Sequence, residues 1–391
     1  LEFAEGRVRY RNRFVRTPAL KAEERAGKAL WGGILTPYLP SDAEVGPDLA
    51  GQWKDRPDVS VLYHGGRYFA LAESARPFQV NRDLATIGPW DFGGKLSNGI
   101  CAHPKIDPKT GELVAFRYGF APPYLTWSAV GSDGTVVRAE EPIDLDRPYM
   151  IHDCLLTEQY LVLFVCPAIL DISGTSASVL QWKPELGTRI AVVPRSGSGK
   201  VRWIATEPFW VWHFANAFET VAEDGSTTII ADFPLWSRLA MADSTPTTCG
   251  VVRAEIDVVG GSIRINRRDD QPTDFPRVDD RRIGRPYRWF YVAGKRGGGA
   301  LPPGEWNELC RYDAETGQMI SRKMGTLRVG EAVFASAGPD TGEDQGYVMT
   351  VATDAATLQS YFLILNAGDI AGEPAATIRL PQRVPAGLHG C

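Results

Sequence analysis

Short, alternating apolar runs that end at tight turns recur along this chain and constrain its fold more than any other feature. Two such runs joined by a few turn residues are typical of a β-hairpin. Long runs with helical periodicity are few. The pattern therefore predicts an all-β fold, and the irregular spacing of the hairpins favours propeller blades with variable loops over a single sandwich. The clearest hairpins are residues 61–71, 105–120, 127–139 and 309–323, with GG, DPKTG, SDG and AETG at their turns.

Four of the five histidines lie in small or apolar sequence contexts: CAHP at His103, MIHD at His152, VWHF at His213 and LHG at His389. They are 49, 61 and 176 residues apart, so only a closed tertiary arrangement could bring them together. If they converge, four imidazoles would form an all-nitrogen site suited to zinc, copper, nickel or iron. No HExxH or CxxC spacing is present, so a buried histidine bonded to backbone is the alternative at each position. The fifth, His64 in LYHGGR, is predicted to be a solvated turn residue.

The segments around the four histidines resemble those of the carotenoid cleavage oxygenase family, which includes bacterial apocarotenoid oxygenases, stilbene-cleaving dioxygenases and the retinoid isomerase of the eye. The matching stretches are AHPKIDPKTGEL, RPYMIHDCLLTEQYLVL, WKPELGTRIAVVPR with FWVWHFANAFE, and VPAGLHG, in the family's order. The resemblance implies a seven-bladed β-propeller that spans residues 1–391 as a single domain. It also implies one non-haem Fe(II) per chain near the propeller axis, open to dioxygen and held by His103, His152, His213 and His389.

The family also has three glutamates that accept hydrogen bonds from the ligating imidazoles, and such partners set the orientation of each ring. The resemblance places them at Glu73 in LAESARPF, paired with His152, and at Glu331 in GEAVFAS, paired with His389. The middle position is Asp274 in TDFPRVDD, paired with His213. Because aspartate is one methylene shorter, we expect a longer hydrogen bond, a bridging water or a local backbone shift at this position.

The resemblance implies that dioxygen splits one C=C bond of a conjugated substrate into two carbonyl products, and that both oxygen atoms enter the products. The protein would supply a hydrophobic tunnel that aligns the substrate and excludes water. In the stilbene-cleaving branch a lysine precedes the first glutamate, where this chain has Ala72, so we expect an apocarotenoid or a related polyene as substrate. Tyr38 could still bind a phenol. The candidate tunnel residues are aromatic: Tyr38, Phe78, Tyr124, Trp127, Phe214 and Phe275.

Four alternatives to polyene cleavage are compatible with the sequence. One is a stilbene-cleaving dioxygenase of the same family, and a second is an iron-dependent isomerase or hydrolase in which the metal acts as a Lewis acid. A third is a non-catalytic binding propeller with vestigial histidines. A zinc hydrolase is the fourth, although catalytic zinc usually has three protein ligands and a water.

Composition limits the surroundings in which this protein works. With 44% hydrophobic and 23% charged residues the chain is globular, and a net charge of −5 with scattered basic residues argues against a nucleic-acid partner. No apolar run approaches the roughly 18 residues of a transmembrane helix. The six cysteines show no paired spacing and indicate reduced thiols. We therefore expect a cytoplasmic protein.

Two segments depart from the strand pattern. Residues 17–32 and 235–242 have helix-favouring composition, and we expect them to form short helical insertions that make a lid above the propeller axis. Their apolar side chains could contact a membrane peripherally, although packing against the propeller is favoured. The glycine-rich residues 295–304 are predicted to be a surface loop. Because the chain begins at LEFAEG and stops two residues after His389, we expect it to be incomplete at both ends.

Overall fold

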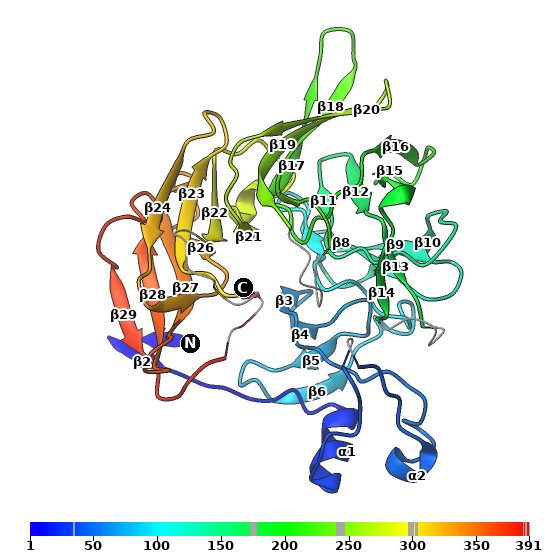
Figure 1. Cartoon of the computed structure of the whole chain (residues 1–391), viewed down its shortest axis with the longest axis vertical. Coiled ribbons are helices and arrows are strands. Elements are labelled where there is room, and N and C mark those ends of the chain that lie inside the picture. Colours follow the sequence, from blue (N-terminus) through cyan, green and yellow to red (C-terminus); the bar gives the residue numbers. More distant parts are fainter. Residues whose placement is uncertain are drawn as a thin grey trace.

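The computed structural model describes residues 1–33, 36–172, 178–239, 247–295, 301, 304–385, 387 and 389–390. The described residues form an all-β propeller in which six antiparallel sheets of four or five strands surround a central axis (Figure 1). The first strand of each sheet lies nearest the axis, and the last strand lies at the rim. Residues at the start of a blade therefore face the centre of the molecule.

The strands of each blade follow one another in the sequence. Blade 1 contains β3 (Ser60–His64), β4 (Arg67–Leu71), β5 (Phe78–Val80) and β6 (Thr86–Pro89). Blade 2 contains β7 (Lys105–Ile106), β8 (Leu113–Tyr118), β9 (Leu125–Val130) and β10 (Val136–Pro142). Blade 3 contains β11 (Leu155–Leu156), β12 (Tyr160–Val165), β15 (Thr188–Pro194) and β16 (Arg202–Thr206).

The remaining blades repeat this order. Blade 4 contains β17 (Asn216–Val221), β18 (Thr227–Trp236), β19 (Cys249–Asp257) and β20 (Ser262–Arg267). Blade 5 contains β21 (Thr273–Arg277), β22 (Trp289–Gly294), β23 (Glu308–Asp313) and β24 (Met319–Lys323). Blade 6 contains β25 (Leu327–Val329), β26 (Val333–Ser336), β27 (Gly346–Asp354), β28 (Ser360–Asn366) and β29 (Ala376–Arg379), with β25 and β26 both paired to β27.

The expected count of seven blades is wrong for the residues that the structure describes, which form six. The strands outside these blades are two short hairpins, β1 (Glu2–Ala4) with β2 (Arg7–Arg9) and β13 (Ala168–Leu170) with β14 (Leu180–Trp182). The strands β1 and β2 are exposed along their whole length and pair only with each other. The Phe3 ring lies 6.1 Å from that of Phe362 in β28, so this hairpin flanks blade 6 and adds no blade.

The four hairpins predicted from turn chemistry are all present. In the β3–β4 hairpin, Gly65 and Gly66 both have positive φ, which is the conformation that a two-residue hairpin turn requires. A Cβ atom at Gly65 would also lie 2.9 Å from the Cα of Gly134, which sits in the β9–β10 turn of the next blade. The turn of blade 1 therefore packs directly against the turn of blade 2, and only glycine fits at this contact.

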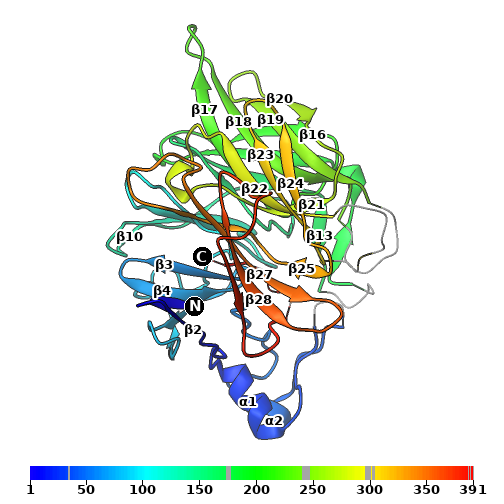
Figure 2. The same ribbon diagram turned by 90° about the vertical axis from the view of Figure 1, so that its left-hand side faces the viewer.

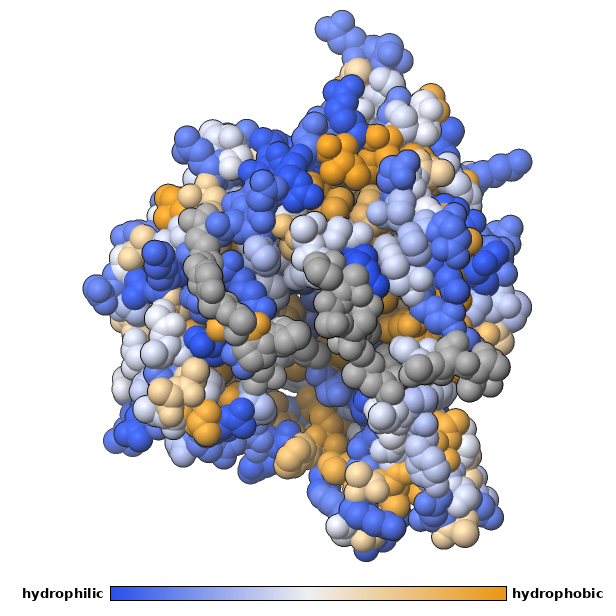
Figure 3. All heavy atoms as spheres, in the orientation of Figure 1, coloured by the Kyte–Doolittle hydropathy of each residue, from blue (hydrophilic) through white to orange (hydrophobic). Residues whose placement is uncertain are grey.

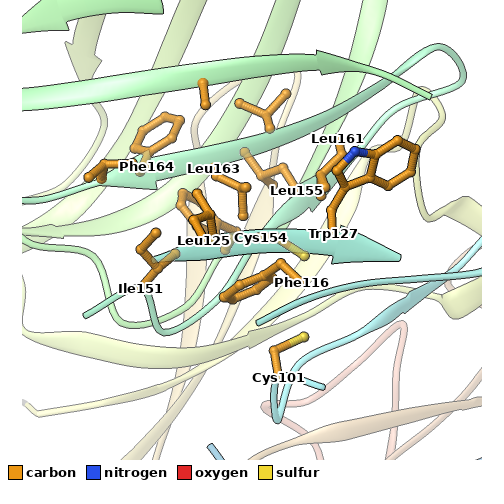
Figure 4. Packing of buried hydrophobic residues seen from close by; sticks show 14 of the residues in the cluster. Cys101, Phe116, Leu125, Trp127, Ile151, Cys154, Leu155, Leu161, Leu163 and Phe164 are labelled. Atoms are coloured by element: carbon orange, nitrogen blue, oxygen red, sulfur yellow. The ribbon is translucent and has the colours of Figure 1, made fainter. Parts of the chain in front are cut away.

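The largest hydrophobic core joins the faces of blades 1 to 4. Figure 4 shows side chains from two of them, among them Phe116, Leu125, Leu155 and Leu163, packed in one interior. The strand β9 is buried at every position because neighbouring blades cover both of its faces. Strand β10, toward the rim, alternates between more and less exposed residues, as expected for a sheet with one solvated face.

The two α-helices of the described residues lie at one end of the molecule and form no lid above the axis. Thr17 caps α1 (Pro18–Ala26) by accepting a hydrogen bond from the Leu20 N–H, so a helix is present within the predicted segment 17–32 but ends at Ala26. Figures 1 and 2 place α1 and the short α2 (Asp42–Val45) beyond β6, at the outer end of blade 1. They share a small separate core with Leu30 and Trp31. The predicted lid is therefore wrong for α1.

The second predicted helix, residues 235–242, is wrong where the structure describes it. Leu235 and Trp236 are the last residues of β18, where they pair with Gly250 and Cys249 of β19. Residues 240–242 lie outside the described residues, as do most of the predicted loop 295–304 and the C-terminal Cys391. Two single-turn 3₁₀ helices, η1 (Pro184–Leu186) and η2 (Asp280–Arg282), complete the described elements.

The surface and the cysteines of the described structure match the expectations from composition. On the face in Figure 3, hydrophilic residues cover most of the rim, and apolar residues gather in patches between blades and near the helices. In the part of the chain that the structure describes, no helix has the length and apolar character needed to cross a membrane. The five described cysteines are buried free thiols, as the unpaired spacing predicts.

Candidate metal centre

Three of the four predicted histidines lie immediately before the innermost strands of successive blades. His103 precedes β7, His152 precedes β11 and His213 precedes β17. The intervals of 49 and 61 residues therefore each correspond to one blade. His389 follows β29, and the chain returns from the rim to the axis, where Figure 1 marks the C-terminus. The propeller topology thus brings all four segments to its centre.

The four imidazoles meet in one cluster. One ring nitrogen from each residue lies within 4.8 Å of the corresponding nitrogen of every other residue. The Nε2 atoms of His152 and His213 are 3.1 Å apart. The ring centroid of His103 lies 4.7 Å from that of His152, 5.1 Å from that of His213 and 4.5 Å from that of His389. This is the convergence that the resemblance implies.

The three predicted carboxylates lie behind three of these rings. His213 Nδ1 is 2.7 Å from Asp274 Oδ1, and His389 Nδ1 is 3.0 Å from Glu331 Oε1. His152 Nδ1 is 2.5 Å from Glu73 Oε1, although this pair lacks the alignment of a hydrogen bond. The hydrogen bonds of His213 and His389 favour the tautomer with hydrogen on Nδ1, which leaves the Nε2 lone pair free to bind a metal.

The backbone beside Asp274 is irregular. The next residue, Phe275, has a φ of 55°, and the β21–β22 pairing shifts register between Asp274 and Arg277. Asp274 Oδ1 also accepts a hydrogen bond of 2.9 Å from the Phe275 N–H. Of the three expected consequences of the shorter side chain, the longer hydrogen bond is absent, because the contact with the imidazole is direct and short. A backbone shift relative to the family stays a prediction.

The donor set fits a cation. Two Nε2 lone pairs 3.1 Å apart repel each other unless a positive charge lies between them. Nitrogens bound at about 2.1 Å and at right angles around one metal would lie about 3 Å apart. His103 Nε2 is buried with no hydrogen-bond partner among the described residues, and buried polar atoms are rarely left so. The cluster therefore has the geometry and the orphaned donor of a metal site.

Electrostatics keep two of the imidazoles, His103 and His213, available as neutral donors. Burial, together with the neighbouring imidazoles, lowers the pKa of His103 and His213 well below the usual value. Burial also opposes protonation of His152, but the charge of Glu73 outweighs it and raises the pKa of that ring. Burial raises the pKa of Asp274 to about 7. A dication at the imidazoles would favour the ionised form of this carboxyl group.

The pKa of Glu331 is lowered, whereas that of Asp274 is raised. Burial alone would raise the pKa of Glu331, but Arg277 and the hydrogen bonds from His389 and Gly390 outweigh burial and bring the pKa to about 2. Arg277 Nη1 lies 3.3 Å from Glu331 Oε2 and donates a hydrogen bond of 3.1 Å to the Gly390 carbonyl. The segment that carries His389 is thus tied to blades 5 and 6.

The neighbouring cysteines are not part of the four-histidine cluster. Burial raises the pKa of the Cys101 thiol to about 12 and that of Cys154 well above its usual value, so both stay protonated. Cys154 Sγ instead lies 3.6 Å from the His103 carbonyl oxygen. His64 does not belong to the cluster either. It is buried, and its Nε2 lies 2.9 Å from the Gly111 carbonyl oxygen, so the prediction that it is solvated is wrong.

A cavity of about 600 Å³ reaches three of the histidines, His103, His213 and His389. Of the six predicted tunnel residues, Phe214 lines this cavity, and the Phe275 ring lies 5.2 Å from the rings of both His213 and His389. These two aromatic residues are therefore brought to the cluster.

The other four predicted tunnel residues lie in different surroundings. Tyr38 is 51% exposed, and its hydroxyl donates a hydrogen bond to Glu44 near α2. Phe78 is buried in β5, and Tyr124 packs against the outside of the main core. Trp127 is buried in β9 with the Arg138 guanidinium over its ring. No contact between these four and the histidines is present in the described structure.

Three aromatic residues that were not predicted lie beside the cluster or beside residues that contact it. The Trp212 ring lies 5.1 Å from that of His152, and Trp306 lies 6.2 Å from Phe275. Tyr118 donates a hydrogen bond of 3.0 Å from its hydroxyl to Glu73 Oε2. The position of Trp212 directly before His213 was the available signal. Nothing local marks Trp306 or Tyr118, which are far from every histidine in the sequence.

A propeller whose axis carries four inward-facing histidines, three of them backed by carboxylates, defines a class of metal-binding β-propeller enzymes. The model of the retinal pigment epithelial membrane protein (RPE65) family matches residues 1–391 of this sequence. The chain belongs to this family, which also contains the carotenoid cleavage oxygenases, and it is a member of a dioxygenase enzyme family.

Curated relatives and solved structures agree with this membership. A carotenoid cleavage oxygenase of Mycobacterium tuberculosis is 30% identical, with 99% of this chain and 84% of the relative covered. An isoeugenol monooxygenase of Pseudomonas nitroreducens is also 30% identical, with 100% and 84% covered. The lignostilbene dioxygenase of Pseudomonas brassicacearum superposes with a TM-score of 0.85 at 29% identity, with 96% of this chain and 82% of that structure covered. A variant of the Synechocystis apocarotenoid oxygenase has a TM-score of 0.84 at 26% identity, with the same shares covered.

Proposed function

We propose that this protein is a non-haem Fe(II) dioxygenase that cleaves one C=C bond of a conjugated polyene, a carotenoid or an apocarotenoid, into two carbonyl products. Residues 1–391 would act as one catalytic domain, with one iron held by His103, His152, His213 and His389. The observation that carries the proposal is the orientation of the rings: three Nδ1 atoms face carboxylates, and the Nε2 atoms of His152 and His213 face each other across 3.1 Å.

Four neutral imidazoles suit a metal that needs both open coordination positions and redox chemistry. Bound Fe(II) would supply the electron density that activates dioxygen toward the alkene. Glu73, Asp274 and Glu331 would fix the tautomer and tilt of three rings, as such partners do at other metal centres. No described acid or base is assigned a proton transfer, because cleavage of an alkene by dioxygen places both oxygen atoms in the products without one.

The aromatic rings around the cluster support a conjugated substrate. The Trp212 ring lies beside His152, the Phe275 ring lies beside His213 and His389, and Phe214 lines the cavity that reaches the cluster. These aromatic side chains would help to align one double bond with the metal and to exclude water. We infer that O₂ and a small hydrophobic molecule are the partners, without nucleic acid. A cytoplasmic location with peripheral membrane contact would give access to lipid-soluble substrates.

A polyene is favoured over a hydroxystilbene by the two positions that could bind a phenol. Ala72, beside Glu73, is buried and has no polar group. The Tyr38 hydroxyl is exposed and engaged with Glu44. Stilbene or phenylpropene cleavage stays the second candidate because the lignostilbene dioxygenase and the isoeugenol monooxygenase are as similar to this chain as the carotenoid oxygenase is.

An ¹⁸O₂ experiment tests the proposal. The iron-loaded protein is incubated with an apocarotenal, 4-hydroxystilbene or isoeugenol under ¹⁸O₂, and the products are analysed by mass spectrometry. Labelled aldehyde from the apocarotenal is the expected result, and labelled aldehyde only from an aromatic substrate would shift the assignment to the second candidate. An unlabelled alcohol or isomer would indicate Lewis-acid chemistry, and full iron binding without any product would indicate a binding propeller.

Matched histidine variants locate the site. His213→Ala should lose iron and product formation, whereas His64→Gln, which alters a buried histidine outside the cluster, should keep both. A His213→Ala protein with one iron per chain would contradict the ligand assignment.

A further inference from the structure

The carboxylate of Asp153 joins three of the histidine-bearing segments without touching any imidazole in the described structure. Its Oδ1 accepts a hydrogen bond of 2.7 Å from the Cys154 N–H and lies 2.8 Å from Lys105 Nζ. Its Oδ2 accepts a hydrogen bond of 3.0 Å from the Phe214 N–H. Lys105 lies two residues after His103, Asp153 follows His152, and Phe214 follows His213. One side chain therefore links the inner ends of blades 2, 3 and 4.

The charged groups of this bridge are buried or partly buried, and a buried charge destabilises the fold unless it is paired. The Asp153 side chain is 2% exposed, so its charge depends on these three donors. Lys105 is 21% exposed at the wall of the cavity that reaches the histidines. Two of the three donors, Lys105 and the Phe214 N–H, come from segments 48 and 61 residues away from Asp153, so they add no local secondary structure. Their effect is to fix the distances between three backbones.

This role differs from that of the carboxylates behind the rings. Glu73, Asp274 and Glu331 act on Nδ1 atoms and so orient single imidazoles. Asp153 acts on the main chain beside the ligands and so sets how far apart the imidazoles stand. A metal at roughly 2 Å from each nitrogen tolerates little change in that separation.

We propose that Asp153, paired with Lys105, is a positioning residue that sets the spacing of His103, His152 and His213 and thereby the metal affinity of the centre. This inference rests on the metal centre proposed above. It assigns to the aspartate after His152 a function that is distinct from metal ligation and from contact with the rings.

Two substitutions separate the parts of the bridge. Asp153→Asn keeps the shape but leaves one acceptor oxygen, so its NH₂ group must face either the Phe214 N–H or the Lys105 ammonium. Lys105→Met removes the cation and leaves both backbone hydrogen bonds to Asp153. We expect Asp153→Asn to weaken metal binding by about 10- to 100-fold, the range seen when outer partners of metal ligands are changed. Lys105→Met should weaken it by a smaller factor.

The matched control is Asp313→Asn. Asp313 is also buried, accepts hydrogen bonds from two backbone N–H groups, those of Glu315 and Thr316, and pairs with Arg288. It lies at the end of β23, at the turn to β24, and has no contact with a histidine in the described structure. Asp313→Asn therefore alters a buried bridging carboxylate without changing the segments that carry the histidines.

The experiment is a Co²⁺ titration of the metal-free full chain, read from the d–d absorption bands that report coordination geometry, with near-ultraviolet circular dichroism to score folding. Wild-type protein should bind one Co²⁺, and its failure to do so would refute the metal centre itself. Given wild-type binding, a weakened affinity and altered bands for Asp153→Asn, with Asp313→Asn unchanged, support the inference. Folded Asp153→Asn with wild-type affinity and bands overturns it. If Asp153→Asn does not fold, Lys105→Met decides: weaker binding supports the bridge, and unchanged binding overturns it.

Discussion

Asp274 Oδ1 lies 2.7 Å from His213 Nδ1, as close as the longer glutamates lie to their imidazoles. Directly after Asp274, Phe275 adopts a φ of 55°, and the pairing of β21 with β22 is irregular there. A non-glycine residue at positive φ costs of order 1 kcal/mol or more, which the surrounding contacts must offset. The short contact to the ring is therefore made beside a strained backbone position.

Asp274→Glu, which restores the family's glutamate, should not improve the centre. The added methylene would have to fit between the backbone and the His213 ring at a buried position, which costs roughly 1–3 kcal/mol of stability. We expect a lower free energy of unfolding and metal affinity equal to or weaker than that of the wild-type protein. Denaturant unfolding and metal titration test this. An increase in both quantities would show that the irregular strand adjusts freely to side-chain length.

Tyr118→Phe should weaken the metal centre through Glu73. The substitution removes the hydroxyl that donates a 3.0 Å hydrogen bond to Glu73 Oε2, and burial raises the pKa of Tyr118 so far that this hydroxyl stays protonated. A hydrogen bond to a charged group contributes about 1.5–3 kcal/mol, so stability should fall by that order. The His152 ring should become less fixed, and metal affinity should fall several-fold.

Tyr287→Phe provides the control for Tyr118→Phe. Tyr287 is also buried and donates its hydroxyl hydrogen bond to a carboxylate, that of Asp232 in β18. We expect a similar loss of stability with unchanged metal affinity. Equal loss of affinity in both variants would mean that affinity follows global stability and that the Tyr118 contact has no specific role.

The local sequence predicts the blades well but predicts neither their number nor the surroundings of the helices. Turn residues such as Gly65 and Gly66 define a hairpin within a few residues. That β1 and β2 form no blade depends on their lying against β28, which no local pattern records. Leu235 and Trp236 have helix-favouring neighbours, yet they pair with β19, an example of tertiary contacts overriding propensity.

The site, like the fold, could be predicted from the sequence only in part. The resemblance to a known family supplied the four histidines and three carboxylates, because each lies in a recognisable segment. The 49- and 61-residue intervals correspond to single blades only once the propeller is known. The aromatic residues could not be chosen from sequence, since most of the chain's Phe, Tyr and Trp residues serve the core. Tyr38 therefore lies at the surface, while Trp212 lies beside His152.

Stability should depend on pH through Glu331. Its pKa is about 2 in the folded protein against an ordinary 4.5, so the unfolded chain binds the proton first as the pH falls. The stabilising contribution is present above pH 4.5 and is lost progressively as the pH falls toward 2. Glu331→Gln lacks this contribution, so its free energy of unfolding should fall less steeply, by up to about 1.4 kcal/mol per pH unit. Denaturant unfolding of both metal-free proteins at pH 5.5, 4.5 and 3.5 measures the two slopes, and parallel curves would contradict the assignment.

Ala72→Lys should shift substrate preference toward phenols. Ala72 is 8% exposed and precedes Glu73, so a lysine here would carry a buried ammonium close to the cluster. Such a cation is stabilised by a phenol or phenolate but not by a polyene. We expect the ratio of kcat/KM for 4-hydroxystilbene to that for an apocarotenal to rise by at least tenfold, with lower stability. Ala72→Met, which adds similar length without charge, should lower polyene cleavage by crowding and leave the ratio unchanged. If the lysine and methionine variants behave alike, this position affects only the space beside Glu73, and another residue must discriminate between the two classes of substrate.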